Sequence, residues 1–312
     1  MNNEEDVAVA SDGNDEFQWR EPRSAFDCNK GYDERFCGGK MQSPINIKLS
    51  EVTLTKYSPF RFDPAYVHKQ KFVAKNTGHT VQLFIQNPSI KPKIFGGGLK
   101  GEYIFEQLHF HWESEHLVDG KRADLEMHMV HYNAKYPSMA KALNNTDGVV
   151  VLAVFFDRTE TRTEARDELF DFINDTVIAE ENYSGYPESN FADFDFTKSG
   201  TFALRDLLPR HLGRFFRYFG SLTTPNYNEV VQWTAFINRL YVSSDILTAL
   251  RTIRDKDNLP ITSNFRPPLA LYGRKVYAQM TDDEILFNSV EFNGEDEICT
   301  EWKESDTMNY EW

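Results

Sequence analysis

An alternation of polar and apolar residues constrains the fold of this chain more than any other sequence feature. Residues 103–112 alternate with the period of two that is typical of a β-strand with one buried face. Residues 80–86 and 125–132 follow the same pattern, and the apolar run at 149–156 has the length of a buried central strand. These segments predict a mostly β domain built on one large sheet.

Helical patterns are few and short. They cover residues 161–176 and 243–255, with one further turn expected at 203–208. No internal repeat and no linker rich in Gly, Ser or Pro divides the chain, which favours a single domain over residues 19–285. We expect residues 1–18 to be a disordered acidic arm. Residues 286–312 are expected to be an acidic tail, which is either solvated or binds calcium or a partner.

The charge balance excludes several classes of partner. The formal net charge of the 312 residues is −14, so the surface repels the phosphates of nucleic acids and of anionic membranes. No run of about 20 apolar residues occurs, so no transmembrane segment is expected. The first 14 residues show neither the basic nor the apolar region of a signal peptide. A cytoplasmic protein is therefore expected, with a secreted mature form as the alternative.

The three cysteines are Cys28, Cys37 and Cys299, and they cannot all pair within one chain. Their spacing does not match a zinc ribbon. Whether any two of them form a disulfide stays open, because sequence spacing does not decide the geometry of the bond.

Three histidines form the strongest chemical signal. In a strand, Gln107, His109 and His111 point to one face, and by the same rule Glu126 and His128 share a face. If the two strands are neighbours, three imidazoles converge and leave a fourth tetrahedral position for water, as in a catalytic zinc site. Gln107 and Glu126 then lie where they can accept the second N–H of His109 and His128. On spacing alone, a cupin-like metal site and plain core packing stay open.

The residues around these histidines resemble the signature of the α-class carbonic anhydrases. Further motifs similar to that family occur in the family's order, and together they span about residues 19–280. The motifs lie at residues 42–47, 76–79, 108–112, 114–116, 126–131, 218–225, 231–233 and 264–267. The loop pattern is most similar to that of non-vertebrate, bacterial-like members, because only Glu113 and Ser114 separate Trp112 from Glu115.

The resemblance implies a single domain on one large, mainly antiparallel central β-sheet with short peripheral helices. It also implies Zn²⁺ bound by His109, His111 and His128, with a zinc-bound hydroxide that attacks carbon dioxide and yields bicarbonate and a proton. Thr223 is expected to accept a hydrogen bond from this hydroxide and to donate its own to an ionised Glu115. The chain is thus expected to be a zinc lyase, a carbonic anhydrase.

Other roles implied by the resemblance concern the proton, the substrate and the ligand shell. His79 is expected to shuttle the proton, because an imidazole titrates near neutral pH. Asn76 is expected to order water beside it, Thr224 to border the substrate and Asn264 to support the zinc ligands. Carbon dioxide and bicarbonate are the expected partners, with sulfonamide or anion inhibitors at the zinc, in a monomer or dimer. An apolar wall for carbon dioxide is expected from Val130, Val151, Leu222 and Trp233.

Departures from the family pattern leave some properties open. Trp19 matches the N-terminal Trp of the family, but Arg20–Glu21 stand where the family has Gly-Tyr. Because that Tyr orders water in the pocket of family members, the turnover rate of this chain is open. Secreted members often carry a disulfide whose first site matches Cys37, but its second site here reads Asn226–Tyr227, which favours an intracellular protein. The alternative function is a non-catalytic binding or adhesion protein on the same fold. Such relatives typically lack one or more of the histidines, and this chain keeps all three.

Overall fold

The computed structural model describes residues 38–160, 164–175 and 199–280, except for the side chains of residues 164–167. The expected arm at 1–18 and the expected tail at 286–312 lie outside the described residues. So do Trp19, Glu21 and the three cysteines.

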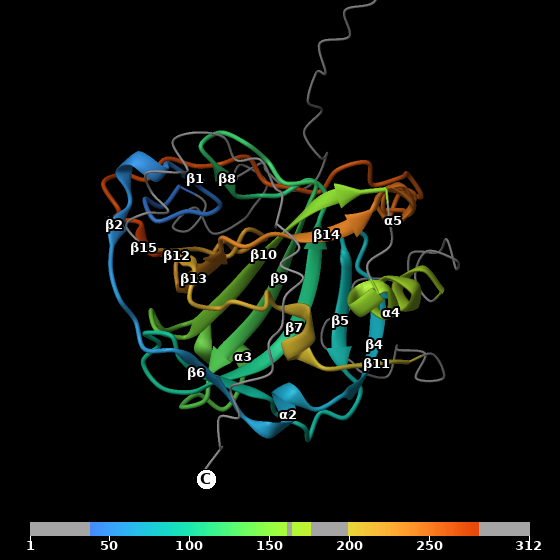
Figure 1. The fold of residues 1–312 in the computed structure, drawn as a ribbon, viewed down its shortest axis with the longest axis horizontal. Coiled ribbons are helices and arrows are strands. Elements are labelled where there is room, and N and C mark those ends of the chain that lie inside the picture. Colours follow the sequence, from blue (N-terminus) through green and yellow to red (C-terminus); the bar gives the residue numbers. More distant parts are fainter. Residues whose placement is uncertain (1–37, 161–163, 176–198, 281–312) are drawn as a thin grey trace, which may run out of the picture.

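One sheet of 13 strands dominates the molecule (Figure 1). Its pairings are mainly antiparallel, and the predicted mostly β fold is confirmed. The strands in order across the sheet are β11 (Gly200–Phe202), β4 (Gln70–Asn76), β5 (Val81–Ile85), β7 (Tyr103–His111), β9 (Leu125–Asn133), β10 (Val149–Thr159), β13 (Val231–Phe236), β12 (Phe215–Gly220), β15 (Tyr277–Gln279) and β2 (Thr53–Leu54).

Smaller elements complete the architecture. In the large sheet β14 (Leu240–Ser243) pairs with β10, while β6 (Lys93–Gly96) pairs with both β7 and β3 (Phe60–Phe62). A separate two-stranded sheet joins β1 (Asn46–Ile47) to β8 (Leu117–Val118). The helices are α2 (Pro64–Val67), α3 (Met139–Ala142), α4 (Glu164–Ile173) and α5 (Ser244–Leu250), with 3-10 helices η1 (Leu49–Glu51) and η4 (Leu204–Leu207). Within the described ranges, no helix is long and apolar enough to cross a membrane.

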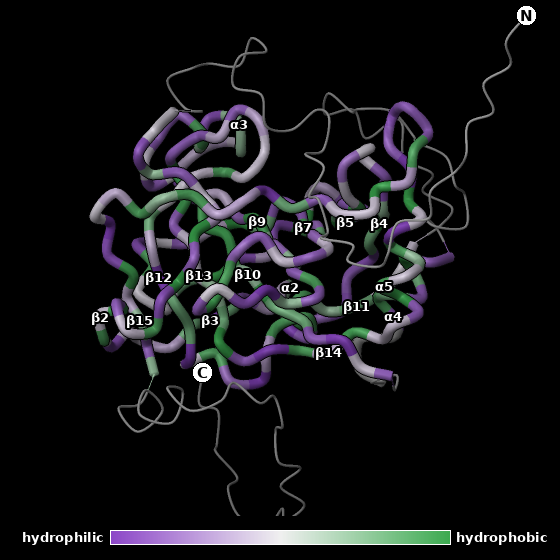
Figure 2. The backbone as a smooth tube through the Cα atoms, turned by 90° about the horizontal axis from the view of Figure 1, so that it is seen from above, coloured by the Kyte–Doolittle hydropathy of each residue, from purple (hydrophilic) through white to green (hydrophobic). Residues whose placement is uncertain are grey.

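Strand β10 is the buried central strand that the apolar run predicts. Every residue from Val149 to Phe156 is buried, and β10 lies between β9 and β13. Because both faces of the sheet are covered here, the strand needs apolar residues at successive positions rather than at alternate ones. The hydrophobic segments gather on these central strands (Figure 2).

The two faces of the central strands have different neighbours. One face carries Leu108, Met129 and Leu152 into the larger apolar core. The other face carries Val130 and Val151 into a second core, next to the histidines. The sheet thus separates a purely apolar layer from a layer in which apolar and titratable side chains meet.

An irregularity in β7 explains why Phe105 and Leu108, which are three residues apart, lie on the same face of the sheet. Phe105 lies opposite His131 and Gln107 lies opposite Val130, so one extra residue is accommodated between them. This β-bulge reverses the alternation. Phe105 therefore joins the larger core, while Gln107 starts the polar face that continues toward the histidines.

The helices lie where the sequence patterns predict them. Of the helix expected at 161–176, residues 161–163 and 176 lie outside the described residues, and α4 covers Glu164–Ile173. The turn expected at 203–208 is the 3-10 helix η4. Helix α5 ends at Leu250, because Thr252 and Ile253 then donate to carbonyls three residues back and the chain enters a tight turn at 254–260.

Candidate metal centre

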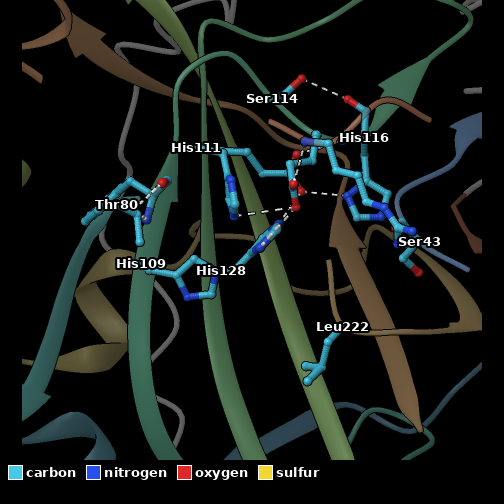
Figure 3. Close-up of polar contacts among 12 residues, drawn as sticks. Ser43, Thr80, His109, His111, Ser114, His116, His128 and Leu222 are labelled. Carbon is cyan, nitrogen blue, oxygen red and sulfur yellow. Dashed lines mark hydrogen bonds and ion pairs between the residues drawn. The ribbon is translucent and has the colours of Figure 1, made fainter. Parts of the chain in front are cut away.

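Strand register brings the three predicted histidines together. His109 lies directly opposite His128, and His111 lies opposite Glu126. Directly opposed residues of neighbouring strands share a face of the sheet. The centroid of the His109 ring lies 5.1 Å from the ring centroid of His111 and 5.1 Å from that of His128. The ring centroids of His111 and His128 lie 4.6 Å apart. The three rings are shown in Figure 3.

Hydrogen bonds orient the two histidines of β7. Nδ1 of His109 lies 2.9 Å from Oε1 of Gln107, the neighbour predicted from strand alternation. Nδ1 of His111 lies 2.9 Å from the backbone oxygen of Asn264. A carbonyl oxygen only accepts, so Nδ1 carries the proton in both rings. Nε2 is then the nitrogen with a free lone pair in each case.

His128 uses the opposite nitrogen. Its Nε2 lies 2.7 Å from Oε1 of Glu126, which is fully buried. Nδ1 of His128 is thus the nitrogen that faces the other two rings. Burial by itself raises the pKa of Glu126, but the neighbouring His116 and His128 outweigh it and hold the pKa well below its usual range. An ionised Glu126 can therefore accept from both histidines.

The donor set fits Zn²⁺. One ligand nitrogen from each of His109, His111 and His128 lies within 4.8 Å of the others. Nε2 of His111 is buried and has no hydrogen-bond partner among the described residues, which is costly unless an ion occupies the space. Three imidazoles with one open position form the coordination set of catalytic zinc.

Burial also keeps the ligands in the form that binds metal. It lowers the pKa of His109 well below the ordinary value, and the neighbouring His111 and His128 lower it further. Burial likewise lowers the pKa of His111. Both rings are therefore neutral near pH 7, as metal coordination requires.

A second cluster, His116 with Glu126 and His128, is a hydrogen-bond network. Glu126 accepts from Nδ1 of His116 at 2.7 Å and from its backbone N–H at 2.9 Å. Contacts this short leave no room for an ion between the groups. The cluster instead fixes the orientation of His128, because Glu126 bonds both His128 and His116.

This network extends to residues whose role was missed at the level of the sequence. Nε2 of His116 lies 2.7 Å from the hydroxyl of Tyr218, which donates to Oγ of Ser43 at 2.8 Å. All three side chains are buried. All three residues lie within the sequence motifs at 114–116, 218–225 and 42–47, and these motifs are the sequence signal that could have identified them. The contacts themselves join segments up to 175 residues apart, which the motifs do not show.

Glu115 lies next to the proposed metal position. Its Oε1 accepts from the backbone N–H of Arg266 at 2.9 Å. Its Oε2 lies 3.5 Å from Nε2 of His111 and 3.8 Å from Nδ1 of His128. The expected hydrogen bond from Thr223 is not formed in the described part of the chain, because Oε2 has no hydrogen-bond partner there. Thr223 itself is buried.

The predicted apolar wall follows one row of the sheet. Val130 lies opposite Val151, and Val151 lies beside Trp233 in the parallel pairing of β10 with β13. The ring of Trp233 lies 4.8 Å from that of His128, and its Nε1–H donates to the carbonyl of Ser221. Register alone therefore places these three side chains on the face of the histidines.

The loop after β12 supplies the remaining pocket residues. Leu222 is half-buried and lies on the same side of the strands as the histidines (Figure 3). Thr224 is exposed, and its carbonyl accepts from the backbone N–H of Tyr227 at 2.8 Å.

The turn after β4 holds His79. Asn264 donates from Nδ2 to the carbonyl of His79 at 2.9 Å, while its own backbone oxygen bonds His111. Burial lowers the pKa of the half-buried His79 imidazole, Asp255 raises it and Lys256 lowers it.

Asn76 makes a backbone hydrogen bond at each end of its carboxamide. Its Oδ1 accepts from the backbone N–H of Gly78, and its Nδ2 donates to the carbonyl of Arg254, both at 2.8 Å. A carboxamide can make two hydrogen bonds at each end, so the water-ordering role stays a prediction. Gln82, which lies opposite His109 in the sheet and so shares its face, was missed. Only the register reveals it.

Comparison with known proteins agrees with this geometry. The family described as eukaryotic-type carbonic anhydrase matches residues 27–280. Carbonic anhydrase 15 of Mus musculus is 37% identical over 78% of this chain and 76% of its own length. Carbonic anhydrase 6 of Bos taurus is 31% identical over 78% of this chain and 74% of its own. Carbonic anhydrase 1 of Mus musculus is 32% identical over 77% of this chain and 90% of its own length.

These relatives correct the expected likeness to bacterial-like members, since all three are mammalian. That expectation rested on one short loop, and the length of a single surface loop changes easily between relatives.

Proposed function

This chain belongs to the eukaryotic-type carbonic anhydrase family, and from that premise we propose how its residues divide the reversible hydration of carbon dioxide. The observation that carries the proposal is the set of three convergent imidazoles, each oriented by a hydrogen bond on its other nitrogen. His109 and His111 would hold Zn²⁺ through Nε2, and His128 through Nδ1. Bound here, Zn²⁺ supplies a hydroxide nucleophile near neutral pH by lowering the pKa of water to about 7.

Glu115 and Thr223 would orient the nucleophile. Glu115 is fixed by the backbone N–H of Arg266, which leaves Oε2 as its remaining acceptor. The Thr223 hydroxyl would donate to this oxygen, so that its own lone pair faces the nucleophile. A donor–acceptor order of this kind has one direction only, because an ionised carboxylate cannot donate.

The apolar row would bind the substrate. Carbon dioxide has no net charge or dipole, so Val130, Val151, Leu222 and Trp233 would hold it by contact area rather than by hydrogen bonds. Thr224, exposed at the mouth of the loop, would contact bicarbonate as it leaves.

His79 would carry the proton away. It is half-buried in a turn tied by Asn264 to the ligand His111, so it lies between the interior and solvent. Its imidazole can both accept and donate a proton near neutral pH.

Zinc-loaded protein in a stopped-flow assay with a pH indicator tests the proposal. We expect carbon dioxide hydration with one zinc per chain, and loss of both zinc and activity in His128→Ala. Hydration no faster than buffer, with zinc bound, would contradict it. Sulfonamides should inhibit hydration, because their deprotonated nitrogen would occupy the fourth zinc position. They should compete with other anions for that position.

We also propose a cytoplasmic location, with no nucleic-acid partner and a monomeric or dimeric state. Asn226 and Tyr227 support the location, because they stand where secreted members place a cysteine. Cell fractionation tests it, and recovery from the culture medium would favour the secreted alternative. Light scattering gives the oligomeric state.

A further inference from the structure

A tight turn at residues 254–260 is built around the carboxylate of Asp255. Its Oδ1 accepts from the backbone N–H groups of Asp257 and Leu259, both at 2.9 Å. The backbone of Asp255 also exchanges hydrogen bonds across the turn, donating to the carbonyl of Leu259 and accepting from Asn258. The side chain of Asp255 therefore organises the turn.

The ends of the turn are anchored in the larger core. Ile253 and Ile261 are buried, and the N–H of Ile261 donates to the carbonyl of Ile253 at 2.7 Å. The carbonyl of Ile261 accepts from the indole N–H of Trp112, also at 2.7 Å. Trp112 follows His111 directly, so the turn is tied to the metal centre through rigid neighbours.

The same turn contacts the segment that carries His79. The carbonyl of Arg254 accepts from Nδ2 of Asn76 at 2.8 Å, and Oδ1 of Asn76 accepts from Gly78, next to His79. Asn76 thus joins the two segments, which are 178 residues apart in the sequence.

Two charges of this turn act on the imidazole of His79. Burial lowers the pKa of His79, the carboxylate of Asp255 raises it and the ammonium of Lys256 lowers it. Two hydrogen bonds of the His79 backbone involve neutral side chains: Nδ2 of Asn264 donates to its carbonyl, and its N–H donates to Oγ1 of Thr77. Asp255 is half-buried and Lys256 is exposed, so solvent screens the lysine more than the carboxylate.

We propose that Asp255 is a positioning residue for proton transfer through His79, because the turn built on its carboxylate is hydrogen-bonded through Asn76 to the His79 segment and carries a negative charge that acts on the imidazole. The inference rests on the proposed function. Desolvation alone makes a buried imidazole a poor proton acceptor, and a nearby carboxylate offsets this. Transfer is fastest when donor and acceptor have similar proton affinities, so the charge of Asp255 sets the rate of export.

The test compares Asp255→Asn with Lys256→Gln in the zinc enzyme. Asparagine keeps an oxygen for the two backbone N–H groups but removes the charge. We expect the pKa of His79, measured by NMR titration, to fall by roughly half a unit to one unit in Asp255→Asn. It should rise in Lys256→Gln, because the side chain of Lys256 is exposed and makes no hydrogen bond or ion pair with the residues that the structure describes.

The kinetic readout separates export from chemistry. In weak buffer, kcat of Asp255→Asn should fall roughly threefold or more, because export limits turnover at saturating substrate. The value of kcat/KM should not change, and a high concentration of imidazole buffer should restore kcat. His79→Ala should show the same pattern more strongly.

An unchanged His79 pKa in both charge variants would overturn the inference. So would a kcat of His79→Ala equal to that of the unmodified enzyme in weak buffer. Failure of the proposed function is a different result, namely no hydration at all by the unmodified zinc enzyme. The NMR titration needs no turnover, and Lys256→Gln tests the electrostatic argument even if Asp255→Asn unfolds.

Discussion

Oε1 of Glu126 lies 2.7 Å from Nε2 of His128, and this contact decides which nitrogen of His128 is left for the metal. His109 and His111 are oriented through Nδ1, so they present Nε2, whereas His128 presents Nδ1. Strand geometry explains the difference, because the ligand positions come from two opposed strands and the rings approach the same point from different directions.

Glu126→Gln should weaken zinc binding by roughly 10- to 100-fold, since a neutral amide is a poorer acceptor and can present its N–H groups to His128 instead. Competition with a chelator measures the affinity. Glu168→Gln is the matched control, because Glu168 lies on the surface, where its side chain is 66% exposed in an ion pair with Lys69. Equal zinc affinity in the two variants would contradict the orienting role of Glu126.

Glu115→Gln should keep zinc and lose activity. The amide would present N–H groups where Oε2 now lies, so Thr223 could no longer donate to it and the order of hydrogen bonds would reverse. We expect kcat/KM to fall roughly a hundredfold, the scale of a misoriented reacting group. Elemental analysis and stopped-flow assays measure the two effects. Glu113→Gln, at a half-exposed glutamate, should change neither quantity.

Val151→Phe should block the substrate region. Val151 lies between Val130 and Trp233 in the apolar row, so added ring atoms have to project toward the histidines. We expect kcat/KM to fall by roughly tenfold or more while zinc content is unchanged. Val151→Ala is the control that enlarges the space. Its kcat/KM should stay near that of the unmodified enzyme, although its unfolding midpoint should fall. Full activity of the phenylalanine variant would place the substrate elsewhere.

His131 should make the fold sensitive to acid. It faces away from the metal centre, its Nε2 lies 3.0 Å from the hydroxyl of Tyr66, and burial lowers its pKa to about 3. Between pH 6.5 and pH 3 the unfolded chain binds a proton that the folded chain does not, so the free energy of unfolding falls as the pH falls. From pH 6.5 to pH 5 the loss from this group is about 2 kcal/mol.

Urea unfolding of the zinc enzyme at the two pH values measures this loss. The double variant Tyr66→Phe with His131→Phe removes the titrating ring without leaving a buried hydroxyl unpaired. Its stability should fall less on acidification, by about the same 2 kcal/mol. The other buried histidines are the same in both proteins, so the difference reports His131. An equal loss of unfolding free energy in the two proteins between pH 6.5 and pH 5 would contradict this role of His131.

Much of the site could be predicted from local sequence. Strand alternation places Gln107 with His109 and His111, and Glu126 with His128, because successive side chains of a strand point to opposite faces. The apolar run at 149–156 predicts the central strand for a similar reason. These inferences need only the period of the backbone, and the structure agrees with them.

Other parts depend on contacts that local sequence does not specify. The β-bulge between Phe105 and Gln107 changes the face of the strand within two residues, which a simple alternation misses. The helix pattern at 243–255 predicts too long a helix, because Asp255 is used by the tight turn rather than by the helix.

Local sequence is enough to identify the side chains that can bind zinc and those that share a strand face. The register that sets His109 against His128 follows only from the folded sheet. So do the backbone oxygen of Asn264 that orients His111 across 153 residues and the backbone bonds of the Asn76 carboxamide. This division arises because alternation is a property of one strand. Register, bulges and long-range hydrogen bonds are instead set by the packing of the whole sheet, which minimises buried polar groups without partners.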